Sequence, residues 1–170
     1  MTPTDDPALA PLALFFQQHC AAEHDGDALF LPGWSVDDWR ALLGHTRTLT
    51  LGQGEVLIKD GDDGRGLYLV ASGALEVTSG SRGGGGALGR LSREGPGSVF
   101  GEISFFDGKP RTATVWATQP TTLLRLDPEA LRAFSDLRPE RGRDLLFALG
   151  RVLAFRMRRG ESQRASLNPY

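Results

Sequence analysis

Short runs of β-branched and aliphatic residues alternate with glycine-bearing turns between Thr46 and about Leu126. Such runs include RTLTL, GEVLIKDGD, GLYLVASG, ALEVTSG, LGRLSREGPG, TATVWAT and TTLLRL, and they recur roughly every ten residues. Short strands at this spacing, with turn residues between them, are typical of a small antiparallel sandwich or barrel. The sequence therefore predicts a mainly β fold for the middle of the chain.

The chain before this β region is predicted to be helical. The stretch PALAPLALFFQQHCAAEH is rich in helix formers, and its apolar stripe recurs at helical spacing through Leu12, Phe15, Phe16 and His19. A second, shorter helix is expected to begin after Ser35, a good N-cap residue with Asp38 three positions later. Residues 1–33 are therefore expected to form an N-terminal helical extension.

Two helices are also expected after the β region. Asp127 and Pro128 open a short helix, which Pro139 ends. This places a hinge at Pro139, before a longer helix of about residues 140–159. The longer helix carries an apolar stripe that is expected to face the core, made of Leu146, Leu149, Leu153 and Met157 and widened by Leu145 and Val152. Residues 161–170 are interpreted as a polar tail.

Length and composition limit the classes of function. With 170 residues, 40% of them hydrophobic and 24% charged, the chain has the composition of one globular domain. Its formal net charge of −2 disfavours non-specific binding to nucleic acid. A single cysteine excludes an internal disulfide, and no basic signal or membrane-length apolar run is present. We therefore predict a cytoplasmic protein with no nucleic-acid or membrane partner.

Charge is distributed unevenly between the two ends of the chain. Residues 1–40 carry seven acidic residues and one arginine, a local charge of −6. Residues 138–170 carry eight arginines and three acidic residues, a local charge of +5. Two solvated faces, or one terminus lying against the other, account for this pattern. A basic C-terminal surface that docks an acidic partner is the alternative.

The residue types needed for catalysis do not fall in the β region. A metal-dependent barrel enzyme needs histidines that converge from the strands, but His19, His24 and His45 all precede the first predicted strand. No G-x-S-x-G motif occurs, and Cys20 lies in a predicted helix with no motif that signals a catalytic base for it. The glycine run at residues 83–86 is interpreted as a hairpin tip, because neither a lysine nor a helix start follows it. We predict no enzyme activity, no metal and no catalytic cofactor.

The segment GSVFGEISFFDGKPRTATVWA, residues 97–117, combines the groups needed to bind a sugar phosphate. Gly101 before a short helical start presents backbone N–H groups to an anion, and Arg111 can contact two phosphate oxygens at once. Glu102 only accepts hydrogen bonds when ionised, which suits sugar hydroxyls, and Thr112 adds a donor and an acceptor. A structural ion pair between Glu102 and Arg111 in a hairpin is the alternative interpretation.

The stretch FGEISFFDGKPRTATVWA resembles the phosphate-binding cassette of the cyclic nucleotide-binding domain. This domain occurs in catabolite-activator-type regulators, in regulatory subunits of cyclic nucleotide-dependent protein kinases and in cyclic nucleotide-gated channels. The match includes Gly-Glu, Pro-Arg-Thr-Ala and the nine-residue spacing between the acid and the arginine, and GEVLIKDGDDGRGLYLVASGALEV resembles the preceding strands. The resemblance covers about residues 34–160. It implies an antiparallel β-roll or jelly-roll barrel over about 46–126, with N-terminal helices and with C-terminal hinge and lid helices over about 127–159.

The resemblance also implies a role for each residue of the cassette. Glu102 is expected to bind the ribose 2′-hydroxyl, and Arg111 the cyclic phosphate. Thr112 occupies a position that is often Thr in cGMP-preferring members, but cAMP is the commoner ligand, and we expect cAMP rather than cGMP. Backbone or close-approach contacts are expected from Gly101, Ile103, Ser104 and Ala113.

The predicted function is a stand-alone cyclic nucleotide receptor. Activator-type regulators carry a helix-turn-helix domain after their last helix, whereas only residues 160–170 follow Arg159 here. In the family the nucleotide draws the last helices over the base, and the candidates for that cap are Phe147, Leu149, Leu153 and Phe155. The output is expected to be altered contact with an unidentified protein or with a second copy through the C-terminal helix. Two alternatives stay open, namely a ligand-independent interaction module and a receptor for another anionic nucleotide such as a cyclic dinucleotide.

Overall fold

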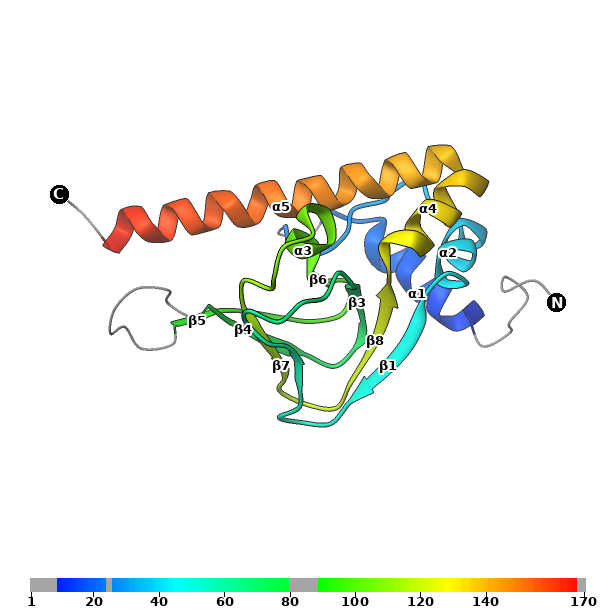
Figure 1. The fold of residues 1–170 in the computed structure, drawn as a ribbon. Coiled ribbons are helices and arrows are strands. Elements are labelled where there is room, and N and C mark those ends of the chain that lie inside the picture. Colours follow the sequence, from blue (N-terminus) through cyan, green and yellow to red (C-terminus); the bar gives the residue numbers. More distant parts are fainter. Residues whose placement is uncertain (1–8, 24–25, 80–88, 168–170) are drawn as a thin grey trace.

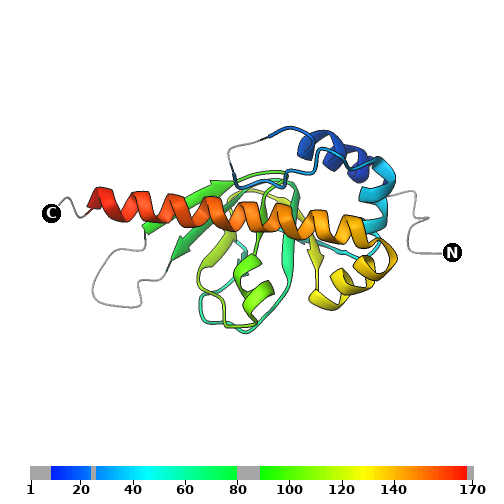
Figure 2. The same ribbon diagram turned by 90° about the horizontal axis from the view of Figure 1, so that it is seen from above.

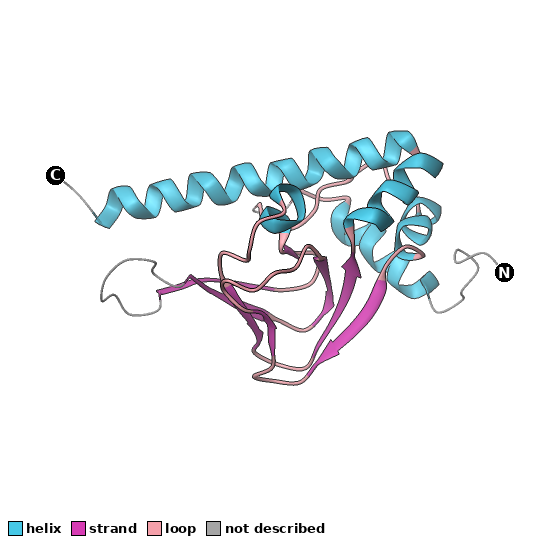
Figure 3. Ribbon diagram, in the orientation of Figure 1, coloured by secondary structure: helices cyan, strands magenta, loops and turns pink. Residues whose placement is uncertain are grey.

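The computed structural model describes residues 9–23, 26–79 and 89–167, and these form a mainly β fold with flanking helices, as predicted (Figures 1 and 3). The helices are α1 (Leu9–Cys20), α2 (Val36–Leu43), α3 (Glu102–Asp107), α4 (Pro128–Leu137) and α5 (Pro139–Leu167). The strands are β1 (Arg47–Leu51), β2 (Val56–Ile58), β3 (Leu67–Ser72), β4 (Leu75–Ser79), β5 (Gly89–Glu94), β6 (Val99–Phe100), β7 (Thr114–Ala117) and β8 (Thr121–Leu126). The predicted hairpin tip at residues 83–86 lies outside the described residues.

Two antiparallel sheets of four strands make up the β-roll. Their strand orders are β1-β8-β3-β6 and β2-β7-β4-β5, so that all pairs of neighbouring strands except β4 and β5 are non-consecutive in sequence. Alternate residues of the strands face inward because side chains point to opposite faces of a strand. The inner faces of both sheets contribute to one apolar cluster, which contains Ile58, Val70, Leu75, Val115 and Leu123. The two antiparallel sheets and the apolar cluster between them confirm the predicted antiparallel β-roll.

The N-terminal helix α1 packs against α2, in a cluster that also includes α4. Phe16 of α1 is fully buried and stacks on Trp39 of α2, with ring centroids 5.1 Å apart. Trp34 and Phe134 lie in the same cluster, which continues onto the outer side of β3 and β8. The predicted apolar stripe of α1 is therefore confirmed, and its partners are the domain's own helices (Figure 2).

A capping box begins α2, and Asp38 of this box also connects α2 to the junction between α4 and α5. The Oγ of Ser35 accepts a hydrogen bond from the backbone N–H of Asp38 at 3.2 Å, and the Ser35 N–H donates to Oδ2 of Asp38 at 2.9 Å. Oδ1 of Asp38 lies 2.9 Å from Nη1 of Arg138 and 3.1 Å from Nε of Arg141. The carboxylate of Asp38 therefore holds the start of α2 against the junction between α4 and α5.

The predicted break between the two C-terminal helices is confirmed, but the predicted inward face of the last helix is partly wrong. Arg138 leaves the helical conformation at φ −137° and ψ 73°, and α5 starts at Pro139. The residues of α5 that enter the core recur at helical spacing and are Leu145, Ala148, Leu149 and Val152. Leu146 and Met157, predicted to point inward, are 44% and 67% exposed. Apolar residues occupy both faces of α5, so periodicity alone did not choose the buried one.

Candidate functional site

Gly101 connects β6 to α3 in a conformation that only glycine adopts readily. Its φ is 83°, in the left-handed region. A Cβ at this position would lie 2.4 Å from Nη1 of Arg111 and 2.7 Å from the carbonyl oxygen of Gly66. The absence of a side chain therefore lets the backbone at the start of α3 approach the guanidinium of Arg111.

Arg111 is a buried cation whose hydrogen bonds go to neutral oxygen atoms. It is 5% exposed, and its Nη1 donates to the carbonyl of Gly101 at 3.0 Å and its Nη2 to that of Gly66 at 2.8 Å. The ring of Tyr68 lies under the guanidinium, with its centroid 5.8 Å away. Burial lowers the pKa of Arg111 because desolvation penalises its charged form. A buried guanidinium whose charge is not neutralised by its hydrogen-bond partners favours an anion as an additional partner.

Glu102, the first residue of α3, forms its ion pair with the last helix. The Glu102 side chain is buried, and its Oε2 lies 2.7 Å from Nη1 of Arg156 in α5. The alternative interpretation of the sequence, an ion pair between Glu102 and Arg111, is therefore wrong. Figure 2 shows how α5 passes alongside α3, which brings the two partners together.

The remaining cassette residues differ in their environment. Both Ser104 and Ile103 belong to α3, where Ser104 is buried and Ile103 is exposed. Thr112 is exposed and Ala113 half-buried on the approach to β7. Gly101, Glu102 and Arg111 are thus the predicted site residues whose contacts the structure brings together around the start of α3.

The N-terminal segment contributes acidic residues to the same region. Asp27 accepts hydrogen bonds from Arg156 and Arg159, and Glu23 lies 2.5 Å from Nη2 of Arg151. One terminus therefore lies against the other, as one interpretation of the charge pattern predicted. Sequence reasoning did not find Asp27 or Arg156 as neighbours of the cassette, and the opposite charge of the two ends was the only signal for them.

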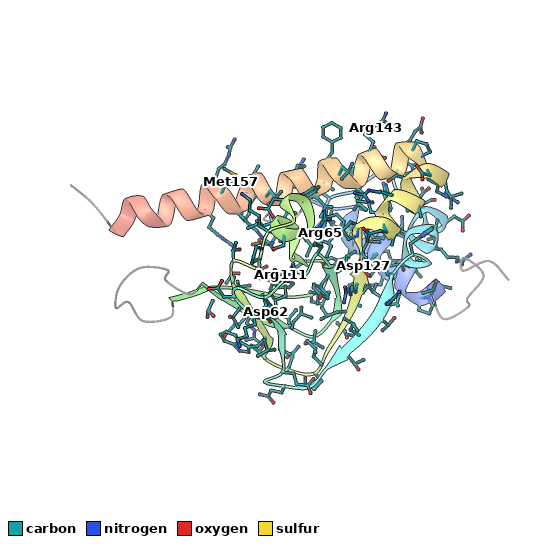
Figure 4. All side chains as sticks on the ribbon, viewed as in Figure 1. Asp62, Arg65, Arg111, Asp127, Arg143 and Met157 are labelled. Carbon is teal, nitrogen blue, oxygen red and sulfur yellow. The ribbon has the colours of Figure 1, made fainter. Side chains whose placement is uncertain are left out.

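A pocket of about 500 Å³ lies beside the cassette, at the start of α4. It is lined by His45, Arg47, Arg65, Arg125, Asp127, Pro128, Glu129 and Ala130. Arg65 connects the pocket to α3 through a hydrogen bond from its Nη2 to the carbonyl of Phe105 at 3.4 Å (Figure 4). Arg125 already pairs with Asp127 at 2.8 Å. The lining of this pocket contains none of the cassette residues between Gly101 and Ala113.

Neither a membrane span nor a metal site is found in the part of the chain that the structure describes. No helix there is long and apolar enough to cross a bilayer. In the same residues, no group of three or more His, Cys, Asp or Glu side chains is arranged to hold a metal ion.

Comparison with known proteins finds a family model that matches the middle of the chain. The family model of the cyclic nucleotide-binding domain matches residues 48–136, more than half of the 170-residue chain. This chain belongs to the cyclic nucleotide-binding domain family. The match contains Gly101, Glu102 and Arg111, whereas Asp27 and Arg156 lie outside it.

Curated relatives of this cyclic nucleotide-binding domain include a transcriptional regulator and a protein kinase regulatory subunit. The chain is 33% identical over 127 residues to a CRP-like cAMP-activated global transcriptional regulator of Mycobacterium tuberculosis, covering 75% of this chain and 54% of the relative. It is 37% identical over 93 residues to a cAMP-dependent protein kinase regulatory subunit of Yarrowia lipolytica, covering 55% of this chain and 23% of the relative. The chain thus spans about half the length of the first of these relatives.

Solved structures share the fold of this domain. The catabolite activator protein of Thermus thermophilus superimposes with a TM-score of 0.69 at 30% identity, over 79% of this chain and 61% of that chain. A cyclic nucleotide-binding domain from Methylobacillus flagellatus superimposes with a TM-score of 0.77 at 22% identity, over 99% of this chain and 96% of that chain. The second comparison extends the shared fold to the helices at both ends.

Proposed function

We propose that this chain is a receptor for a cyclic nucleotide, whose phosphate binds at Arg111 and whose ribose 2′-hydroxyl binds at Glu102. The observation that carries the proposal is the buried guanidinium of Arg111, whose hydrogen bonds go to the carbonyl oxygens of Gly101 and Gly66. A cyclic phosphate carries one negative charge, and a guanidinium donates two parallel hydrogen bonds to such a group. The carboxylate of Glu102, at the first position of α3, is the matching acceptor for a hydroxyl.

Within this proposal, cAMP is the favoured ligand. The two curated relatives described above are named for cAMP, which supports cAMP as the first nucleotide to test. Thr112 is exposed next to Arg111, where its hydroxyl is available to a purine amino group. The ratio of the affinities for cAMP and cGMP therefore shows which purine the site prefers, and its change in Thr112→Ala measures what Thr112 contributes.

The proposed output is a ligand-dependent movement of α4 and α5 about the junction at Arg138. This residue is the non-helical break between the two helices, and α5 is paired with the cassette through Glu102. The outward side of α5 carries the exposed apolar residues Leu146, Phe147 and Met157. A second copy of the chain or another protein would contact this side of α5, so that ligand binding alters a protein contact.

Calorimetric titration with cAMP and with cGMP tests the proposal. We expect micromolar or tighter binding by the wild-type chain. Arg111→Ala would leave the phosphate desolvated and unpaired, which costs about 3–5 kcal/mol, or at least 10²-fold to 10³-fold in affinity. Arg65→Ala is the matched control, because Arg65 is an exposed arginine bonded to α3, and it should bind as the wild type does.

The other outcomes of the titration contradict the proposal. Absence of binding by the wild-type chain would favour a ligand-independent interaction module. Binding of a cyclic dinucleotide in place of both cyclic mononucleotides would assign the site to a different anion. Equal binding by the wild type and Arg111→Ala would exclude Arg111 as the phosphate ligand.

A further inference from the structure

Arg156 of α5 uses all three of its guanidinium nitrogens on partners around the cassette. Its Nη1 lies 2.7 Å from Oε2 of Glu102, and its Nε donates to Oδ1 of Asp27 at 2.6 Å. Its Nη2 donates to the carbonyl oxygen of Val99 at 2.7 Å. The guanidinium is therefore held in one orientation by a carboxylate on each side and by the strand that leads into α3.

Asp27 fixes the other side of this guanidinium. The segment that carries Asp27 is attached to the β-roll, because the Leu29 N–H donates to the carbonyl of Gly97 at 3.2 Å and Ala28 forms an isolated β-bridge with Ser98. Asp27 also accepts a hydrogen bond from Arg159, one helical turn after Arg156. The N-terminal segment thus anchors α5 at the point where α5 reaches the cassette.

Glu102 depends on this arrangement for its ion pair and its orientation. An ionised carboxylate that is buried needs a compensating partner, and the ion pair of Glu102 is with Arg156. The ion pair with Arg156 leaves Glu102 able to accept a further hydrogen bond, because the two oxygens of a carboxylate together accept several hydrogen bonds. Burial alone lowers the pKa of Arg156, and the charges of Glu102 and Asp27 outweigh burial and raise it, so Arg156 stays a cation.

We propose that Arg156 is a positioning residue for ribose recognition, which acts through Glu102, and that Asp27 holds Arg156 in place for this role. This inference rests on the proposed function and adds two residues that lie outside the family match at 48–136. It makes nucleotide affinity depend on α5 and on the N-terminal segment together. Conversely, a ribose bound at Glu102 favours the docked position of both segments, because coupling between two sites is reciprocal.

The test compares cAMP with 2′-deoxy-cAMP, which lacks the hydroxyl assigned to Glu102. We expect Arg156→Ala to weaken cAMP binding about 10-fold to 100-fold, because a charge-assisted interaction is lost. Binding of 2′-deoxy-cAMP should be weak and nearly equal in the wild type and the variant. Asp27→Asn should weaken cAMP binding in the same selective way but less, because Arg156 keeps its contact with Glu102.

Two further variants separate positioning from general stability. Arg151→Ala also removes a contact between α5 and the N-terminal segment, to Glu23, but does not touch Glu102, and it should bind both ligands as the wild type does. Arg156→Lys keeps the positive charge and should bind cAMP more tightly than Arg156→Ala but more weakly than the wild type. It takes the place of Arg156→Ala in the test if Arg156→Ala does not fold.

Each remaining result overturns the inference. Equal or tighter cAMP binding by Arg156→Ala would show that Arg156 does not support Glu102. An equal loss for cAMP and 2′-deoxy-cAMP would show a structural role only. A wild-type chain that binds neither cAMP nor cGMP would overturn the proposed function and the inference with it, whereas the first two results leave the proposed function intact.

Discussion

The carbonyl oxygen of Gly101 accepts a hydrogen bond from Nη1 of Arg111 at 3.0 Å, and a Cβ on Gly101 would come within 2.4 Å of that nitrogen. Backbone and guanidinium are therefore in direct contact at the start of α3. The positive φ of Gly101 and the position of Arg111 depend on each other, and this pair is the structural basis of the candidate phosphate site.

Gly101→Ala should weaken both folding and ligand binding. The left-handed conformation costs a non-glycine residue about 1–2 kcal/mol, and the new methyl group would also meet the backbone carbonyl of Gly66, which a side-chain rotation cannot relieve. Gly150→Ala is the control, because Gly150 is an exposed residue inside α5 with open space at the Cβ position. It should stabilise the chain by about 0.5–1 kcal/mol. Urea unfolding and cAMP titration of both variants check this, and a destabilised Gly150→Ala beside a neutral Gly101→Ala would contradict it.

Asp38 should make the chain less stable in acid. Burial by itself raises the pKa of Asp38, but the hydrogen bonds from Ser35 and the charge of Arg141 outweigh burial and hold the pKa below its ordinary value of 3.8. The stability that this lowered pKa contributes is fully present above about pH 3.8 and is lost as the pH falls through the folded-state pKa.

Asp38→Asn should therefore lower the free energy of unfolding by about 1.5–3 kcal/mol at pH 7, and the difference from the wild type should shrink below pH 3.8. Asp37→Asn is the matched control, because the Asp37 side chain is 77% exposed and its ion pair with Arg40 is long, at 3.6 Å. Its effect should stay within about 0.5 kcal/mol. Chemical unfolding between pH 2 and pH 8 measures both variants. An Asp38→Asn difference independent of pH would contradict the assignment.

Glu94 should have the opposite pH dependence. Burial and the nearby charge of Asp27 raise the pKa of Glu94 above its ordinary value of 4.5. The stability linked to this raised pKa is fully present below pH 4.5 and is lost as the pH rises through the folded-state pKa. Glu94→Gln should therefore be more stable than the wild type at neutral pH, and the gain should disappear below pH 4.5. Thermal unfolding across this range measures the gain, and a less stable Glu94→Gln at pH 7 would show that the contact with Arg159 at 3.7 Å dominates instead.

Cys20 should be unreactive in the folded chain. It is fully buried at the end of α1, and burial raises its pKa to about 12, so the thiolate is scarce near pH 8. A thiol reagent at pH 8 should label Cys20 of the unfolded chain at once. In the native chain it should label Cys20 only as fast as local unfolding exposes the thiol. Rapid labelling of the native chain would show that α1 detaches readily from the domain.

The strands and the cassette were predictable because their signals are local. Alternating β-branched residues and glycine turns mark β1 to β8 within a few residues each, although the two-residue strand β6 carries too short a pattern to stand out. Gly101 and Arg111 likewise belong to one stretch of about ten residues, whose spacing identified the family. The capping box at Ser35 and the break at Pro139 follow the same rule, since each depends on neighbours along the chain.

By itself, the sequence determined the short strands and the order of the flanking helices, because short-range preferences specify those features. The β-roll and the roles of the acid and the arginine in the cassette followed from the family resemblance of one continuous stretch. Only the tertiary structure decided which face of α5 is buried, since apolar residues line both sides of that helix and the domain surface selects one. It also decided that Glu102 pairs with Arg156 and that Arg156 pairs with Asp27. These partners lie far apart in the chain, and no local pattern records a contact that exists only once α5 and the N-terminal segment have docked on the roll.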